Sequence, residues 1–277
     1  MSAPDEPAPA AHAASTRTII VEQHGPALLV RLNRPDKLNA INVEMAGELL
    51  EMFQKAETDR SVIAIVLTGN ERAFCAGADL GRMGATPGHE WDAYRERMNI
   101  APNRNLHRTL CFYTKPIISA VEGYCLGGGF ELAMWGDFIV ASETASFGLP
   151  ETARGFIPGG GGTQNLPRLI GPALAKELIW SGRRITAAEA KEFRIVNHVV
   201  PKGGAVDKAL AIVEEMAKNA PLGLMMSKLA INRGLDGSRY NGMLTEGDLA
   251  HMLWFSEDRE EGLKAFAEKR KPDYKGQ

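Results

Sequence analysis

Glu131 and Glu151 are the side chains in this sequence best suited to acid–base chemistry. Glu131 lies two residues beyond the glycine run 127–129, and Glu151 ends the segment 147–151, directly after a proline. If both carboxylates entered one pocket, burial and mutual repulsion would separate their pKa values and permit one base and one acid. The simpler interpretations are a glutamate that complements a helix dipole and a solvated loop glutamate. Spacing along the chain leaves both alternatives open.

Two glycine-containing turns provide backbone groups that could act beside these carboxylates. The run 127–129 opens a predicted apolar helix, where unpaired N–H groups at the positive end of the dipole would stabilise an oxyanion. Residues 74–80 follow a predicted strand, and the small residues at 76–78 would let a ligand approach the main-chain N–H groups. A flexible joint and a plain tight turn are the simpler alternatives.

Other familiar chemistries lack their usual motifs. Phosphate-loop, dinucleotide-binding, serine-hydrolase and zincin signatures are all missing from the sequence. The glycine-rich run 158–163 has no lysine after it, so we interpret it as a tight connection that brings the backbone close to the site and starts a helix over 163–170. The histidines stand singly, and each is predicted to be a surface or structural residue: His12, His24, His89, His107, His198 and His251.

The elements that must position these groups follow an α/β pattern up to about residue 200. Segments 18–23 and 27–33 predict a hairpin, and a helix with Asn42 as its N-cap follows them. Short β-branched runs predict strands that are buried on both faces, at 62–69, 115–124 and 137–142.

Beyond residue 167 the pattern is mostly helical. Segment 173–182 ends in a C-cap glycine, residues 186–189 form a capping box, and a short apolar piece at 194–200 interrupts the helices. Helices are then predicted over 205–219, 222–235, 240–256 and 259–270. The sequence therefore predicts a disordered Pro/Ala-rich tail at 1–16, an α/β core at 17–200 and a helical C-terminal region at 201–277.

Composition excludes several classes of function. The chain has 277 residues, with 32 Lys+Arg against 34 Asp+Glu and a formal charge of −2, so a nucleic-acid or anionic-lipid partner is not expected. No apolar stretch approaches the roughly 18 residues of a membrane-spanning helix. Cys75, Cys111 and Cys125 are odd in number and widely spaced, which argues against disulfides and against a cysteine metal site. We expect no metal and a reducing, cytoplasmic location.

Five ordered segments together closely resemble the enoyl-CoA hydratase/isomerase (crotonase) superfamily. They are LNRPDKLNAIN (32–42), AFCAGADL (73–80), KPIISAVEGYCLGGGFELAMWGD (115–137), SFGLPETARGFIPGGGGTQNLPRLIG (146–171) and FAEKRKPDYKGQ (266–277). The resemblance runs from about Thr18 to the C-terminus. It implies the crotonase-like (ClpP/crotonase) fold, an α/β spiral of ββα units with a helical C-terminal trimerisation region.

The resemblance also implies an acyl-CoA site and a reaction. The N–H groups of Ala78 and Gly128 would form the oxyanion hole, Glu131 would deprotonate the water that adds to Cβ, and Glu151 would deliver a proton to Cα. The substrate and its CoA moiety would be bound by Ala76, Gly77, Ala78, Asp79, Leu80 and Gly128. The expected reaction is reversible hydration of trans-2-enoyl-CoA to 3-hydroxyacyl-CoA, with coenzyme A as part of the substrate and no other cofactor.

Alternatives remain within and outside the family. A Δ3,Δ2-enoyl-CoA isomerase, or another dehydratase, decarboxylase or hydrolase of acyl-CoA, is the nearest alternative, and a non-catalytic acyl-CoA-binding protein belongs to a different class. The family pattern implies a homotrimer or homohexamer. Gly81 stands where the family often has a CoA-binding lysine, so that contact is lost or is replaced by Arg82 or by the basic tail of a neighbouring subunit. The tail residues are Lys269, Arg270, Lys271 and Lys275, for which a solvated charge run is the simpler interpretation. Candidates for the acyl pocket are Met83, Trp91, Met98, Phe112, Trp135 and Phe156.

Overall fold

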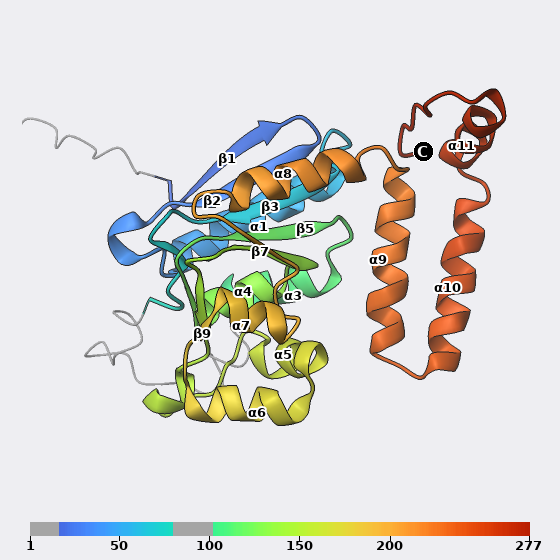
Figure 1. Ribbon diagram of the computed structural model, residues 1–277. Helices are drawn as coiled ribbons and strands as arrows, with labels where there is room; N and C mark the ends of the chain where they lie inside the picture. The colour runs from blue at the N-terminus through green and yellow to red at the C-terminus, as the bar shows by residue number, and fades with distance from the viewer. Residues whose placement is uncertain (1–16, 80–101) are drawn as a thin grey trace, which may run out of the picture.

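A six-stranded sheet forms the centre of the protein (Figure 1). The computed structural model describes residues 17–79 and 102–277, so the predicted tail 1–16 lies outside the described residues. The strands, in spatial order, are β1 (Ile19–His24), β2 (Ala27–Leu32), β3 (Ala64–Thr68), β5 (Ile117–Val121), β7 (Phe138–Ser142) and β10 (His198–Val200). β1 and β2 form the predicted antiparallel hairpin, and the other neighbours pair in parallel.

The central strands β3, β5 and β7 are buried on both faces, as the β-branched runs predict, whereas the edge strands β1 and β10 are mostly exposed. Helices α1 (Val43–Thr58) and α3 (Pro102–Phe112) cover one face, where they meet Val30, Ile65 and Ile117. Helix α8 (Ala205–Met216) covers the other face, which includes Leu29 and Val66. Adjacent residues of one strand point to opposite faces, so each central strand contributes to two apolar layers.

A second, smaller sheet lies beside the first and was not predicted. Its order is β4 (Ala73–Cys75), β6 (Tyr124–Leu126), β8 (Ser146–Gly148) and β9 (Ile185–Thr186). The first three strands are parallel, and β9 is antiparallel to β8. Strands of two or three residues are too short to show a period of two, which is why the sequence pattern does not reveal them.

Helices and short turns complete the core, and several local predictions are confirmed. The Asn42 side chain accepts from the Met45 N–H at 2.9 Å, Thr186 and Glu189 form a capping box, and Gly182 ends a helix in the left-handed conformation. The helices and short 3₁₀ turns that complete the core are η1 (Pro35–Lys37), α4 (Gly128–Met134), η3 (Glu151–Arg154), α5 (Gly162–Ile170), α6 (Pro172–Ser181) and α7 (Ala187–Glu192).

The last three helices extend away from the sheets. They are α9 (Pro221–Leu235), α10 (Arg239–Leu253) and α11 (Glu257–Glu268), and Figure 1 shows α9 and α10 side by side. Helix α8 packs on the large sheet, so the part of the chain that packs on this sheet extends to Met216. Lys228 ties α9 to the core, since its Nζ donates to the Lys115 carbonyl at 2.8 Å and to Asp137 Oδ2 at 2.9 Å. In the described residues, no helix is both long and apolar enough to cross a membrane.

Candidate active site

Three adjacent parallel strands of the small sheet bring the predicted site residues together. The turn at 76–79 follows β4, the glycine run 127–129 follows β6, and Glu151 follows β8. Parallel strands end at the same edge of a sheet, so the three segments meet there. The buried strands of the large sheet do not lead directly into these turns, because β4 and β6 intervene.

The backbone nitrogens of Ala78 and Gly128 lie close to one another. A Cβ placed on Gly128 would lie 3.5 Å from the Ala78 nitrogen, and one placed on Gly77 would lie 3.3 Å from the Gly128 nitrogen. Gly77 (φ 108°) and Gly127 (φ 52°) both adopt the left-handed conformation that favours glycine. Neither the Ala78 nor the Gly128 N–H donates to another residue within 17–79 and 102–277, so both are available to a ligand oxygen.

The other predicted binding residues near β4 have their N–H groups engaged. The Ala76 N–H donates to the Leu38 carbonyl at 3.0 Å, and the Asp79 N–H donates to the Ile41 carbonyl at 2.9 Å. The Asp79 carboxylate also pairs with Arg34 at 2.9 Å. Leu80, Gly81 and Arg82 lie outside the described residues. The Gly77 N–H donates to Cys75 Sγ at 3.4 Å, so among residues 76–79 Ala78 is the one whose N–H can bind an oxyanion.

Glu131 is buried in the first turn of α4 and is held in one orientation. Its Oε1 accepts from the Gly160 N–H at 2.7 Å and from the Gly162 N–H at 2.8 Å. Burial raises the pKa of this carboxyl, and the two N–H donors oppose that rise. No described residue donates to Oε2, so Oε2 is the oxygen that can take a proton from a ligand or a water.

Glu151 is half-buried at the start of η3 and lies close to the glycine run. A Cβ on Gly127 would lie 3.1 Å from Glu151 Oε1, while Glu151 Oε2 is buried without a hydrogen-bond partner among the described residues. Burial raises the pKa of Glu151, a hydrogen bond from its own backbone N–H opposes that rise, the charge of Glu131 adds to it, and the charge of Arg154 opposes it. The structure thus brings the two carboxylates close together, and Glu151 is not a solvated loop glutamate.

The loop 158–162 forms a wall of this space and needs its glycines. The Gly160 carbonyl accepts from Trp135 Nε1 at 2.6 Å, and a Cβ on Gly161 would lie 2.8 Å from the Trp135 ring. A Cβ on Gly160 would lie 2.8 Å from Glu131 Oε2 and 2.6 Å from His107 Nε2. The predicted tight connection, which leads into α5, is confirmed. His107 was predicted to be a surface or structural residue, and sequence reasoning missed its place beside Glu131.

Trp135 is the acyl-pocket candidate that the structure places at this wall. Phe112 and Phe156 are 74% and 53% exposed, and Met83, Trp91 and Met98 lie outside the described residues. Among the described residues, no group of three or more His, Cys, Asp or Glu side chains is placed to hold a metal ion.

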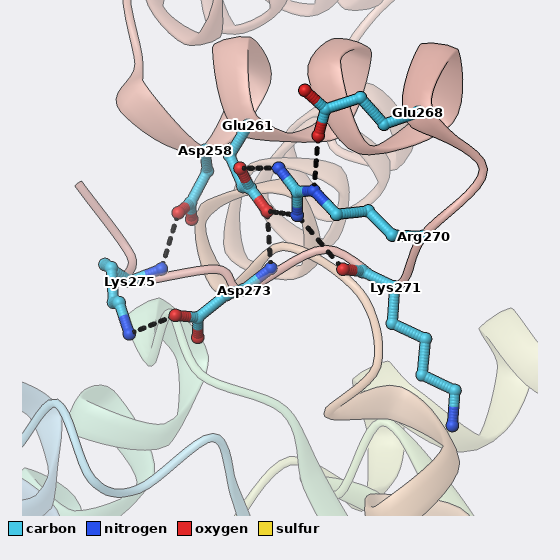
Figure 2. A network of polar contacts seen from close by, with 7 residues as sticks. All are labelled: Asp258, Glu261, Glu268, Arg270, Lys271, Asp273 and Lys275. Atoms are coloured by element: carbon cyan, nitrogen blue, oxygen red, sulfur yellow. Dashed lines mark hydrogen bonds and ion pairs between the residues drawn. The ribbon is translucent and has the colours of Figure 1, made fainter.

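The basic C-terminal tail folds back on α11, as Figure 2 shows. Arg270 donates to Glu261 and Glu268, and Lys275 Nζ lies 2.7 Å from Asp273. The Lys275 N–H donates to the buried Asp258 at 2.6 Å. Within one chain, these carboxylates neutralise part of the positive charge of the C-terminal tail, which is the charge that we considered for CoA binding.

The chain is similar to known proteins in both sequence and fold. The family model described as enoyl-CoA hydratase/isomerase matches residues 22–277. The chain is 40% identical over 258 residues to the 2,3-dehydroadipyl-CoA hydratase of Escherichia coli (strain K12), covering 93% of this chain and 98% of the relative. It is 42% identical over 264 residues to a probable enoyl-CoA hydratase of Rhizobium meliloti (strain 1021), covering 94% and 99%. The crystal structure of an enoyl-CoA hydratase from Bacillus anthracis superposes with a TM-score of 0.87 at 39% identity, covering 94% and 100%.

Proposed function

The chain belongs to the enoyl-CoA hydratase/isomerase family and is an enzyme of the hydro-lyase type, and we propose that it reversibly adds water to a trans-2-enoyl-CoA to give a 3-hydroxyacyl-CoA. One observation carries this proposal. Two available N–H groups and two carboxylates with raised pKa values line one space at the edge of the small sheet. This is the set of groups that addition of water to a conjugated thioester requires.

The oxyanion hole would make Cβ of the substrate electrophilic. Attack at Cβ moves electrons through Cα onto the thioester oxygen, and the N–H groups of Ala78 and Gly128 would donate to that oxygen. A preorganised donor of this kind contributes about 2.7–4 kcal/mol to the transition state. The glycines at 77 and 127 bring the two N–H groups together without a side chain between them.

The environments of the two carboxylates favour opposite protonation states. Glu131 receives two backbone N–H donors, which favour the ionised form that takes a proton from water. Glu151 Oε2 has no donor among the described residues, and burial together with the neighbouring Glu131 charge raises the pKa of Glu151, although its own backbone N–H and Arg154 favour ionisation. As the water oxygen bonds to Cβ, its proton passes to Glu131 Oε2. Glu151 gives its proton to Cα, and exchange with solvent restores both groups.

Substrate binding and assembly belong to the same proposal. The CoA moiety would contact the turn 76–80, in which the N–H groups of Ala76 and Asp79 are already engaged within the protein. The chemistry needs no metal and no cofactor besides the coenzyme A of the substrate. We also propose a cytoplasmic location for the protein, because the odd number and wide spacing of its cysteines are typical of a reducing compartment. A homotrimer or homohexamer would cover the exposed apolar side chains of α9–α11 and of the turn between α10 and α11, which include Ile231, Leu235, Met243, Trp254, Phe255 and Phe266.

Hydration of crotonyl-CoA tests the function directly. Purified enzyme should remove the absorbance of the conjugated thioester, and the product should gain the mass of one water. A 3-enoyl-CoA supplied in parallel separates hydration from isomerisation. Binding of crotonyl-CoA without turnover, or conversion of the 3-enoyl substrate alone, would contradict the proposal.

A further inference from the structure

His107 is a titratable group in this site to which the proposed reaction gives no role. It lies on α3, its ring is 6.4 Å from that of Trp135, and its Nε2 faces Gly160. Nδ1 is buried and has no hydrogen-bond partner among the described residues. Of the two ring nitrogens, Nδ1 is therefore buried without a partner among the described residues, and Nε2 is directed toward the site.

The directed nitrogen and the reactive oxygen of Glu131 lie near one another. Both are close to one point, the position of a Cβ on Gly160, which is 2.6 Å from His107 Nε2 and 2.8 Å from Glu131 Oε2. No hydrogen bond or ion pair joins the two atoms directly. The two atoms are therefore close enough for one oxygen atom, such as that of a water, to make an ordinary hydrogen bond of about 2.8 Å to each of them.

The burial of Nδ1 indicates which nitrogen carries the proton. Burial lowers the pKa of His107 to about 4, so the ring is neutral at neutral pH and holds one proton. A proton on Nδ1 would be a buried donor without an acceptor, whereas a proton on Nε2 faces the Glu131 carboxylate. The Nε2–H form is favoured, and it directs a hydrogen-bond donor toward the water that Glu131 would use.

We propose that His107 positions the reacting oxygen, because its Nε2–H donates to the same oxygen that Glu131 Oε2 holds. This inference rests on the proposed hydratase function, in which that oxygen is the attacking water and later the 3-hydroxyl group of the product. The water then gives one proton to Glu131, directs one lone pair at Cβ and accepts from His107 with the other. No proton leaves His107 during the reaction.

Two variants of His107 separate a donor from a structural side chain. His107→Phe keeps a ring against Trp135 but removes the donor, and His107→Gln places an uncharged N–H donor at a similar reach. We expect His107→Phe to lower kcat for crotonyl-CoA about 10- to 100-fold, since misplacing a reactant costs up to about 100-fold, with KM almost unchanged. His107→Gln should recover most of this loss. His24→Gln, a change on an exposed hairpin histidine, is the matched control and should have no effect.

The outcomes distinguish this inference from the proposed function. If the wild-type enzyme does not hydrate crotonyl-CoA, the function fails and the inference fails with it. If the wild type is active and His107→Phe has the same kcat, only the inference is overturned. It is also overturned if His107→Gln removes the acid limb of the pH profile of kcat/KM, because His107 would then be the base. An unchanged acid limb together with recovery in His107→Gln supports the assignment.

Discussion

Glu131 provides the sharpest test of the site, because its two oxygens have separate tasks. Oε1 satisfies the buried N–H groups of Gly160 and Gly162, while Oε2 has no donor among the described residues. Glu131→Gln keeps an oxygen for the first task and replaces the second oxygen with an NH₂ group. Glu131→Ala removes both. The two variants should therefore affect turnover alike and stability differently.

The loss of turnover follows from the loss of a base. A positioned acid–base group contributes about 10²- to 10⁴-fold, so each variant should lower kcat by that order. Crotonyl-CoA affinity should change little, because neither Oε1 nor Oε2 belongs to the proposed CoA contacts. Glu44→Gln is the matched control, since Glu44 also lies in the first turn of a helix but is exposed.

The stability difference follows from the two backbone donors. Glu131→Ala leaves the N–H groups of Gly160 and Gly162 without their acceptor, at about 1–3 kcal/mol each where water does not replace it. Glu131→Gln keeps both bonds. Thermal and urea unfolding, measured beside the wild type, should show a lower free energy of unfolding for the alanine variant only.

The pH dependence gives a further check with a definite sign. Burial raises the pKa of Glu131 above its usual 4.5, so the folded state holds this proton more tightly than the unfolded state. The resulting stabilisation is complete below pH 4.5 and is lost as the pH rises through the raised pKa. Glutamine does not titrate, so Glu131→Gln should gain stability relative to the wild type over that interval. Turnover of Glu131→Gln within tenfold of the wild type, or destabilisation equal to that of the alanine variant, would refute the reasoning.

Three further predictions concern the neighbouring groups. If Glu151 is the acid, kcat/KM should fall as the pH rises through its raised pKa. In Glu151→Gln this alkaline limb of the pH profile should disappear, and kcat should be about 10²- to 10⁴-fold lower. An unchanged alkaline limb would assign the acid role to another group. Gly160→Ala should lower kcat with a smaller effect on KM, because the new Cβ would displace the His107 and Glu131 side chains. Full activity would contradict this prediction, because it would show that the loop 158–162 shifts to make room for the methyl group. Lys228→Met should destabilise the packing of α9 on the core by about 1–3 kcal/mol, because it removes two hydrogen bonds. Amide hydrogen exchange in α9 should then be faster than in the wild type, with no change in kcat. Equal exchange in the variant and the wild type would contradict this prediction.

Local signals were sufficient for much of the fold. The hairpin, the Asn42 N-cap, the capping box at Thr186 and the helices of the C-terminal region depend on contacts within a few residues, and all are confirmed. The small sheet was missed, because the pairing of β4, β6 and β8 joins segments that are 20 to 50 residues apart through strands of three residues. No local period reports such a pairing.

The same distinction holds for the site. The sequence by itself determined which groups were available: two glycine turns, two glutamates and the motifs of the enoyl-CoA hydratase/isomerase family. Only the tertiary structure decided that Glu131 and Glu151 lie close together, that Oε1 of Glu131 is occupied, and that His107 faces Oε2 across Gly160. The physical reason is that a pKa shift or a shared oxygen depends on distance and burial, and both arise when strands far apart in the sequence end at one edge of a sheet.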